Sequence, residues 1–254
     1  MQNLKPKKYL GQHFLADENI ARKIVSLLPS SPQLPVVEIG PGMGVLTKYL
    51  LADRPEVHVV EFDPDAVAYL QAEFPVPALR IHAGDVLAWD PGAHLAGEAH
   101  FIGNLPYNVS SPIFFHLLAH RDHVRSGAFM VQKEVADRIC AEHGGPVKER
   151  GILTVLLDCY YELHMAFKVP PTVFRPPPKV MSAVFTMQRR ADVDVPFAPL
   201  LKVVKAAFGQ RRKTLRNALK PLNLDKTAFP DAWLDLRAEV LTTAQFVVLA
   251  QALR

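Results

Sequence analysis

The chain has 254 residues, of which 49% are hydrophobic and 21% charged, and its formal net charge is +4. This composition excludes a disordered protein, and the two cysteines, Cys140 and Cys159, exclude a disulfide scaffold or a four-cysteine zinc site. No apolar run approaches the roughly 20 residues of a membrane span and the N-terminus has no secretory pattern, so we expect a cytoplasmic protein with one large and one smaller domain.

The first 130 residues alternate short apolar runs with helical patterns. The predicted strands cover residues 34–40, 57–63, 79–82, 100–104, 128–132, 152–162 and 182–188. The helices predicted between them cover residues 45–52, 65–73, 111–119 and 134–142. Strands that alternate with helices predict an α/β fold, with a mostly parallel sheet covered by helices on both faces. The last strands follow each other more closely, which favours an antiparallel edge.

The pattern changes in the last third of the chain. Residues 168–180 contain five of the 22 prolines, and because proline fixes φ and lacks an N–H, they predict a stiff loop that is neither strand nor helix. After about residue 190 the strand patterns stop, and residues 199–208, 211–222 and 242–253 are typical of helices. We therefore predict a first domain over residues 1–190 and a small all-helical domain over residues 191–254.

Positive charge is concentrated between residues 189 and 220, which hold nine Lys or Arg against two Asp. Lys5, Lys7 and Lys8 add to it at the N-terminus. Clustered positive charge suits a polyanion such as nucleic acid. The same residues also fit the solvated face of a helix, and charge alone does not decide between these interpretations.

The first predicted strand leads directly into a turn that contains Gly40, Gly42 and Gly44. Glycine lets the backbone turn sharply and approach a ligand closely. The dinucleotide fingerprint requires Gly-x-Gly-x-x-Gly, whereas Val45 occupies its third glycine position here, so NAD is disfavoured.

Two carboxylates follow the next two predicted strands. Glu61 comes 21 residues after Gly40, where it can accept hydrogen bonds from both ribose hydroxyls of a nucleoside. Asp85 follows the third strand and can accept a hydrogen bond from an exocyclic amine. The glycine turn followed by these two acids resembles the S-adenosylmethionine pocket of class I methyltransferases. The alternative is a strand–helix turn with packing glycines and ordinary surface acids.

The segment Asn104-Leu105-Pro106-Tyr107 ends the fourth predicted strand, where ligands bind in open α/β sheets. The exocyclic amine of adenine is a poor nucleophile because its lone pair is delocalised into the ring. The Asn104 side-chain oxygen and the Leu105 carbonyl can accept the amine hydrogens, which favours a tetrahedral nitrogen with an available lone pair. Pro106 stiffens the turn, and the ring of Tyr107 can stack on a base, a contact worth about 1–3 kcal/mol.

These four residues resemble the (Asn/Asp/Ser)-Pro-Pro-Tyr signature of amino-group methyltransferases, with Leu105 in place of the first proline. A strand–turn with a buried tyrosine is the alternative. A target base inside a duplex or a stacked loop must first be extruded. Phe174, in the proline-rich segment, is a candidate to sandwich that base against Tyr107 and equally a candidate for packing in the core.

Six motifs occur in order along the chain: KKYLGQHFL (7–15), VVEIGPGMGVLT (36–47), GNLPYNVSSPIFFHLL (103–118), MVQKEVADR (130–138), VPPTVFRPPPKVMSAV (169–184) and AAFGQRRKTLRNAL (206–219). Together they resemble the KsgA-type ribosomal RNA adenine dimethyltransferases over about residues 5–220. The resemblance implies a class I methyltransferase fold, S-adenosylmethionine as methyl donor and no metal. It also implies transfer of four methyl groups to N6 of two adjacent adenosines in the 3′-terminal hairpin of 16S rRNA, during biogenesis of the small ribosomal subunit. We expect a bacterial enzyme that acts as a monomer.

The resemblance also assigns roles to single residues. It implies cofactor contacts at His13, Leu15, Gly40, Glu61, Asp85 and Asn104, and we add Gly42 from the same turn. It implies that Asn104, Leu105 and Tyr107 hold the target amine, with Phe174 stacked on the base. His13 stands where many relatives carry Asn, and its neutral imidazole can donate a hydrogen bond to the methionine carboxylate.

Residues 208–219 combine Leu215 and Leu219, which can pack inward, with Arg212 and Arg216, which can face outward together. Our hypothesis assigns phosphate contacts to Arg211, Arg212, Lys213 and Arg216. Three other functions stay open. They are methylation of large-subunit rRNA of the antibiotic-resistance type, methylation of DNA, and a small-subunit assembly role in which methylation is secondary. Methylation of DNA is disfavoured because residues 191–254 leave little room for a target-recognition domain.

Overall fold

The computed structural model describes residues 7, 11–31, 33–141, 150–191, 193–210 and 212–254. The chain divides into two compact units. The first unit contains residues 1–136 and 164–189, and the second contains residues 137–163 and 190–254. Residues 137–163, expected in the first domain, therefore belong to the unit that holds the C-terminal helices.

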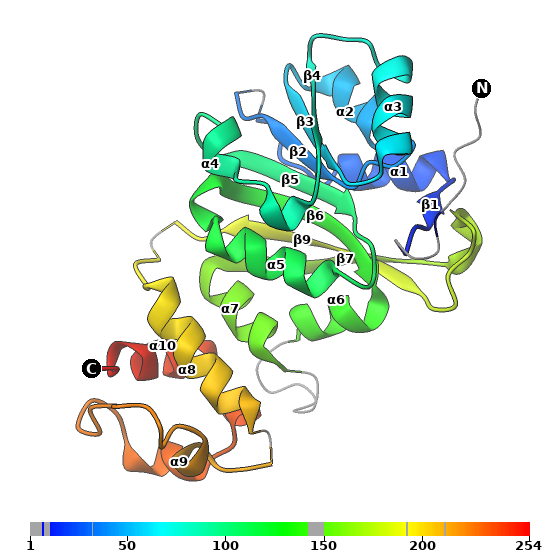
Figure 1. Cartoon of the computed structure of the whole chain (residues 1–254). Coiled ribbons are helices and arrows are strands. Elements are labelled where there is room, and N and C mark those ends of the chain that lie inside the picture. Colours follow the sequence, from blue (N-terminus) through cyan, green and yellow to red (C-terminus); the bar gives the residue numbers. More distant parts are fainter. Residues whose placement is uncertain (1–6, 8–10, 32, 142–149, 192, 211) are drawn as a thin grey trace. The chain divides into compact units, whose positions relative to one another are not determined.

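A seven-stranded sheet in the order β4-β3-β2-β5-β6-β9-β7 forms the centre of the first unit (Figure 1). Its strands are β2 (Val36–Ile39), β3 (Val57–Glu61), β4 (Leu79–Ala83), β5 (Ala99–Asn104), β6 (Val124–Gln132), β7 (Tyr161–Val169, of which this unit holds residues 164–169) and β9 (Ser182–Arg189). The strands from β4 to β6 are parallel, and β9 runs antiparallel to β6, which confirms the expected antiparallel edge. Since β2 pairs with β3 on one side and β5 on the other, the strand order reverses at β2. Ligands of open α/β sheets bind beside such a reversal, at the carboxyl ends of the strands.

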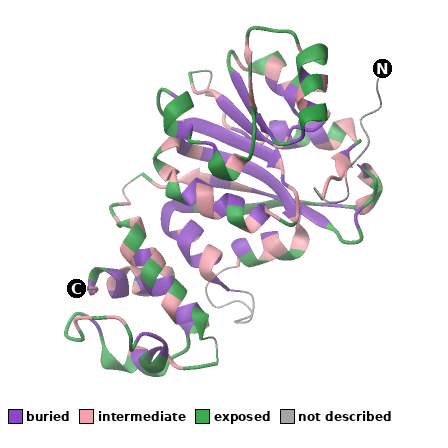
Figure 2. Ribbon diagram, viewed as in Figure 1, coloured by how far each residue is buried: buried purple, intermediate pink, exposed green. Residues whose placement is uncertain are grey.

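Helices cover both faces of this sheet. Alternate residues of each buried strand face opposite sides, so both faces carry apolar side chains that the helices bury. The helical elements are α1 (Glu18–Val25), α2 (Thr47–Asp53), α3 (Pro64–Glu73), η2 (Val86–Ala88), α4 (Pro91–His94), α5 (Ser110–Ala119) and η3 (Arg121–His123), followed by α6 (Lys133–Ile139), which continues into the second unit. Val36 and Val57 pack in one core cluster with residues of α1, α2 and α3. On the opposite face, the ring of Phe114 in α5 lies edge-on to Phe129 of β6, at 5.3 Å between centroids. Figure 2 shows the inner strands of the sheet mostly buried and the outer helix surfaces exposed, whereas the edge strands β4 and β7 are largely exposed or half-buried.

Two short elements lie in the segment predicted as a stiff loop, so this prediction is wrong in part. Residues 171–173 form the 3-10 turn η4 (Pro171–Val173), and β8 (Phe174–Arg175) pairs antiparallel with β1 (Phe14–Leu15). The pairing partner comes from about 160 residues earlier in the chain, which no local pattern reveals. This two-stranded sheet joins the N-terminal segment to the proline-rich segment by backbone pairing.

The second unit is mostly helical. Its elements are α7 (Ile152–Tyr160), α8 (Phe197–Gly209), α9 (Leu215–Ala218), η5 (Asp231–Asp235), η6 (Ala238–Val240) and α10 (Thr243–Gln251). The strand predicted over residues 152–162 is wrong, because residues 152–160 form α7 and β7 begins at Tyr161. A continuous apolar run fits a buried helix as well as a buried strand, and α7 is covered by α8 and α10. Leu215 and Leu219 are buried and Arg212 and Arg216 are exposed, as predicted.

Candidate functional site

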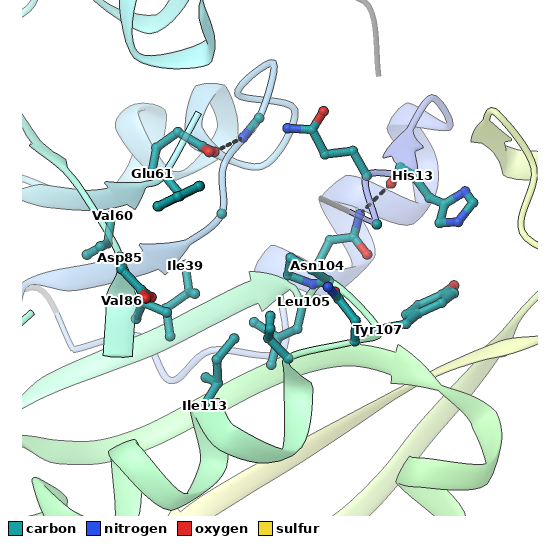
Figure 3. Close-up of a pocket in the computed structure, with 18 of the residues that line it drawn as sticks. His13, Ile39, Val60, Glu61, Asp85, Val86, Asn104, Leu105, Tyr107 and Ile113 are labelled. Atoms are coloured by element: carbon teal, nitrogen blue, oxygen red, sulfur yellow. Dashed lines mark hydrogen bonds between the residues drawn. The ribbon is translucent and has the colours of Figure 1, made fainter. Parts of the chain in front are cut away.

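A pocket lies at the carboxyl ends of β2, β3, β4 and β5, beside the reversal in strand order (Figure 3). Its lining comprises residues 11–14 of the N-terminal segment, Gly40 and Gly42 after β2, Glu61 and Phe62 at the end of β3, Asp85 and Val86 after β4, and residues 104–109 at the end of β5. In Figure 3, Glu61 and Asp85 lie on one side, His13 and Tyr107 lie on the other, and Asn104 and Leu105 lie between them. The fold therefore brings most of the predicted site residues together.

The glycine turn and Glu61 form one hydrogen-bonded unit. Gly40 and Gly42 have φ of +66° and +55°, a region that favours glycine. The Gly42 N–H donates to Glu61 Oε2 at 3.0 Å, and the Asp63 N–H donates to Glu61 Oε1 at 2.8 Å. Burial raises the pKa of Glu61, and these two N–H donors offset part of the rise. A carboxylate has about four acceptor sites, so each oxygen keeps capacity for a ligand hydroxyl.

Glu38 is a second buried acid beside this turn, two residues before Gly40 and within the motif of residues 36–47. It is 2% exposed and lines a small cavity together with Gly40 and Asn104. The Thr47 hydroxyl donates to Glu38 Oε2 at 2.6 Å. Burial raises the pKa of Glu38 to about 8. The sequence analysis did not single out this residue, although the motif contains it.

The side of the pocket near β4 combines one acid with apolar surface. Asp85 is exposed, and its Oδ1 accepts a hydrogen bond from the Leu87 N–H at 2.9 Å. Phe62 follows Glu61 directly, lines the pocket and is 59% exposed, which is high for so large an apolar side chain. Val86 and Ile113 add further apolar lining. Phe62 is not among the predicted site residues, although an aromatic residue directly after an acid at a strand end is a signal for such a role.

Asn104 is the last residue of β5, and its carboxamide has a fixed orientation. The Asn104 Nδ2 group donates to the main-chain carbonyl of His13 at 2.9 Å (Figure 3). Since that bond uses the amide nitrogen, Oδ1 remains available as an acceptor in the pocket. The Leu105 N–H donates to the Met130 carbonyl of β6 at 3.0 Å, which fixes the next peptide group as well.

The ring of Tyr107 forms the opposite wall. Its hydroxyl bonds to Ser182 Oγ at 2.5 Å, and its ring stacks on the imidazole of His13, with 5.5 Å between centroids and 29° between planes. Burial raises the pKa of Tyr107, and the bond to Ser182 offsets part of the rise. The imidazole Nδ1 lies 2.8 Å from the Pro176 carbonyl. His13 thus contacts both the tyrosine and the proline-rich segment.

Asp63 binds two side chains of the N-terminal segment close to Glu61. Lys7 Nζ lies 2.5 Å from Asp63 Oδ1, and Gln12 Nε2 donates to Asp63 Oδ2 at 3.0 Å. Burial alone would raise the pKa of Asp63, but Lys7 and Gln12 outweigh it and hold this pKa below its ordinary value. Asp63 also caps α3 by accepting from the Asp65 N–H. The contacts with Lys7 and Gln12 join residues more than 50 positions apart and had no sequence signal.

Two predicted contacts lie outside the pocket lining. Phe174, expected to stack on a target base, is fully buried and belongs to the core cluster of the first unit, so that prediction is corrected. The reason is its pairing in β8, where Phe174 lies opposite Leu15 and both side chains turn into the core. Leu15 lines only the small cavity that it shares with Gly40 and Asn104. The ring that lies against Tyr107 is that of His13.

The predicted phosphate contacts differ in their surroundings. Arg211 lies outside the described residues. Arg212 and Lys213 are exposed and form no ion pair with another residue in the described ranges. Arg216 lies 2.7 Å from Asp231 and 2.9 Å from Asp235, and its bonds to both carboxylates raise its pKa further above its ordinary value. A phosphate at Arg216 would therefore compete with two carboxylates.

Neither a metal-binding cluster nor a membrane-spanning helix is found among the described residues. No group of three or more His, Cys, Asp or Glu side chains in these residues is arranged to hold a metal ion. None of the helices in the same ranges has the length and apolar character needed to span a bilayer.

Comparison with known proteins gives full-length matches. A family model described as "Ribosomal RNA adenine dimethylase" matches residues 3–242. The chain is 45% identical to "Ribosomal RNA small subunit methyltransferase A" of Flavobacterium johnsoniae, over 99% of this chain and 97% of that protein. It is 47% identical to the protein of the same name from Parabacteroides distasonis, over 98% and 94% of the two chains.

Solved structures of similar fold also span nearly the whole chain. A dimethyladenosine transferase from Plasmodium falciparum superposes with a TM-score of 0.78 at 24% identity, covering 93% of this chain and 96% of that one. The 23S rRNA methyltransferase ErmE superposes with a TM-score of 0.73 at 24% identity, covering 94% and 99%. These superpositions show a class I methyltransferase fold, as the sequence predicts.

Proposed function

The chain belongs to the ribosomal RNA adenine dimethylase family, and from this premise we propose how its pocket works. The enzyme transfers methyl groups from S-adenosylmethionine to N6 of two adjacent adenosines in the 3′-terminal hairpin of 16S rRNA. The single observation that carries the residue assignment is the oriented carboxamide of Asn104 at the end of β5, across the pocket from Glu61. We also propose that the enzyme acts as a monomer in the cytoplasm, where small ribosomal subunits are assembled.

The residues of the pocket fit an adenosine-bearing cofactor. The buried Glu61 carboxylate suits two ribose hydroxyls, and Asp85, on the adjacent strand end, suits an exocyclic amine. Phe62 and Val86 offer apolar surface to the purine between them. His13 and the glycine turn lie toward Asn104, where the methionine portion belongs. When bound, S-adenosylmethionine supplies an electrophilic methyl group on its sulfur.

The other half of the pocket prepares the target amine. Asn104 Oδ1 and the Leu105 carbonyl accept its two hydrogens, so the nitrogen becomes more tetrahedral and its lone pair points away from the base plane. S-adenosylmethionine, held by Glu61 and Asp85, would supply the methyl carbon to this lone pair and leave as S-adenosylhomocysteine, and the proton of N6 would pass to solvent. The two acceptors stabilise the positive charge that develops on the nitrogen. Tyr107 holds the extruded base by stacking, and the alignment of the three reacting atoms supplies most of the acceleration.

The RNA contacts are assigned to the helical region of the chain. We propose that residues 1–190 carry the transfer reaction and that residues 191–254 contact rRNA. Arg212 and Lys213 are exposed cations without a carboxylate partner among the described residues, so their charge is available to phosphate groups. Arg211 is assigned the same role from the sequence alone.

The experiment is radiolabelled methyl transfer to small ribosomal subunits that lack the modification, followed by nucleoside analysis. We expect N6,N6-dimethyladenosine in the 16S rRNA and no label in large subunits or duplex DNA. Two variants separate the halves of the pocket. Glu61→Ala should lose cofactor binding, measured by calorimetry, whereas Asn104→Ala should lower transfer by roughly 100-fold or more because an acceptor for the reacting amine is lost.

Different outcomes of these experiments would contradict the proposed substrate and the proposed mechanism. Label in large subunits alone would contradict the proposed substrate. Unchanged turnover in Asn104→Ala would contradict the mechanism while leaving the activity intact. A Glu61→Ala protein that still binds unmodified small subunits would show that cofactor binding and subunit binding are separate properties of the chain.

A further inference from the structure

The hydroxyl of Tyr107 is bonded to a serine that lies outside the pocket. The Tyr107 hydroxyl and Ser182 Oγ are 2.5 Å apart, although 75 positions separate the residues. Ser182 is 0% exposed and does not line the pocket. A side chain so placed cannot touch the base, the cofactor or RNA. Any effect it has on the reaction is therefore indirect, and its hydrogen bond leads to Tyr107.

The main chain around Ser182 is fixed by strand pairing with β6. Ser182 is the first residue of β9 and pairs with Gln132, the last residue of β6. The Lys133 N–H donates to the Met181 carbonyl at 2.9 Å, which extends the pairing by one residue. Leu105, beside Tyr107, is also bonded to β6, through the Met130 carbonyl. The same strand thus fixes both the serine and the Asn104–Leu105 peptide group, which directly precedes the Leu105 carbonyl.

The bond to Ser182 holds the tyrosine ring at its far edge. Figure 3 shows the hydroxyl end of Tyr107 directed away from Asn104 and Leu105. A tyrosine ring attached only at Cβ can turn about two side-chain torsions. The hydroxyl oxygen lies on the axis from Cβ through the ring, so the bond to Ser182 fixes the direction of that axis, which the first torsion sets. Rotation about the axis is limited by the imidazole of His13, which stacks on the ring with 5.5 Å between centroids.

We propose that Ser182 is a positioning residue for methyl transfer, because it fixes the hydroxyl end of Tyr107 and so the direction of the ring on which the target adenine stacks. The inference rests on the proposed function and extends it to a residue that makes no substrate contact. With Phe174 buried in the core, the orientation of Tyr107 decides where the purine plane lies. A tilt of that plane moves N6 away from Asn104 Oδ1, and a displacement of about 1 Å can lower a rate by roughly 100-fold.

A double-mutant cycle on the hydroxyl pair tests this inference. The variants are Ser182→Ala, Tyr107→Phe and the double variant, assayed for transfer to unmodified small subunits. Either single change leaves one buried hydroxyl without its partner, which we expect to lower kcat/KM by roughly 5- to 30-fold. The double variant removes both hydroxyls, so we expect it to be no slower than the slower single variant. Affinity for S-adenosylmethionine, measured by calorimetry, should stay within twofold of wild type throughout.

Ser126→Ala is the matched control. Ser126 is 3% exposed, lies on β6, does not line the pocket and bonds to His100 at 2.7 Å. The variant therefore reports the effect of losing the hydrogen bond of a buried serine elsewhere in the same sheet. We expect a lowered Tm and a kcat/KM within twofold of wild type.

If the wild type transfers methyl groups, three results would overturn the inference. The first is a Ser182→Ala protein with kcat/KM within twofold of wild type. The second is a double variant whose loss equals the product of the single losses. The third is an equal loss of activity in Ser126→Ala, which would indicate a general effect of stability. Should Ser182→Ala fail to fold, Tyr107→Phe breaks the same bond from the other side. Absence of transfer by the wild type would overturn the proposed function and this inference with it.

Discussion

Glu38 should make the folded chain less stable as the pH rises. It is 2% exposed, and burial raises its pKa from 4.5 to about 8, with nearby Glu61 adding to the rise and the Thr47 hydroxyl opposing it. Below pH 4.5 the acid is protonated in both the folded and the unfolded chain, and the stability is complete. Between pH 4.5 and about 8 the unfolded chain releases the proton while the folded chain retains it. The free energy of unfolding therefore falls across this range.

The size of the effect follows from the two pKa values. Each pH unit in the window is worth about 1.4 kcal/mol, so the full range corresponds to an upper limit of about 5 kcal/mol. The perturbation is Glu38→Gln, which keeps the shape and removes the titration. We expect the variant to gain about 3 kcal/mol relative to wild type between pH 5.5 and pH 8.0. Urea unfolding of both cofactor-free proteins at the two pH values measures this difference.

The comparison isolates Glu38 because the other titrating groups are common to the two proteins and cancel in the difference. A difference between variant and wild type that is the same at pH 5.5 and pH 8.0 would refute the reasoning. It would show that Glu38 ionises in the folded chain at its ordinary pKa.

Three further predictions concern the cofactor, acid stability and RNA. Gly42→Ala should weaken S-adenosylmethionine binding by roughly tenfold in calorimetry, because φ is +55° and the new Cβ would lie 2.8 Å from the ring of Phe14. His100 is 1% exposed, and burial lowers its pKa to about 4, so stability should fall by up to about 3 kcal/mol as the pH drops from 6.5 to 4. His100→Gln should lose that part of the acid dependence in urea unfolding. Replacing Arg212 and Lys213 by Ala should reduce the slope of log affinity against log salt by about 2 in filter binding to small-subunit rRNA.

Each of these predictions has a contrary result. Tight cofactor binding by Gly42→Ala would show that the turn tolerates a side chain. The same acid dependence in His100→Gln and wild type would place the titration elsewhere. For the RNA test, Arg216→Ala is the control, because its pairing with Asp231 and Asp235 predicts a smaller change in slope. A larger change for Arg216 than for the other two cations would reverse the assignment.

The positions of Gly40, Glu61 and Asn104 could be predicted because each depends only on local order. A residue at the end of a parallel strand lies at the carboxyl edge of the sheet whatever the rest of the chain does. The helix over residues 152–160 could not be predicted, because a continuous apolar run has no period that separates strand from helix. Packing of α7 against α8 and α10 decided its form.

Tertiary structure alone decided which side chains meet across the pocket. No local pattern decided between stacking and core packing for Phe174, and none indicated that it pairs with Leu15 or that Ser182 reaches Tyr107. These contacts join segments 75 to about 160 positions apart, and their geometry depends on strand register, which shifts a side chain to the opposite face with a slip of one residue. The sequence by itself determined the chemistry at the strand ends. The three-dimensional packing determined that His13 lies against the tyrosine, because register and burial act only once the sheet has formed.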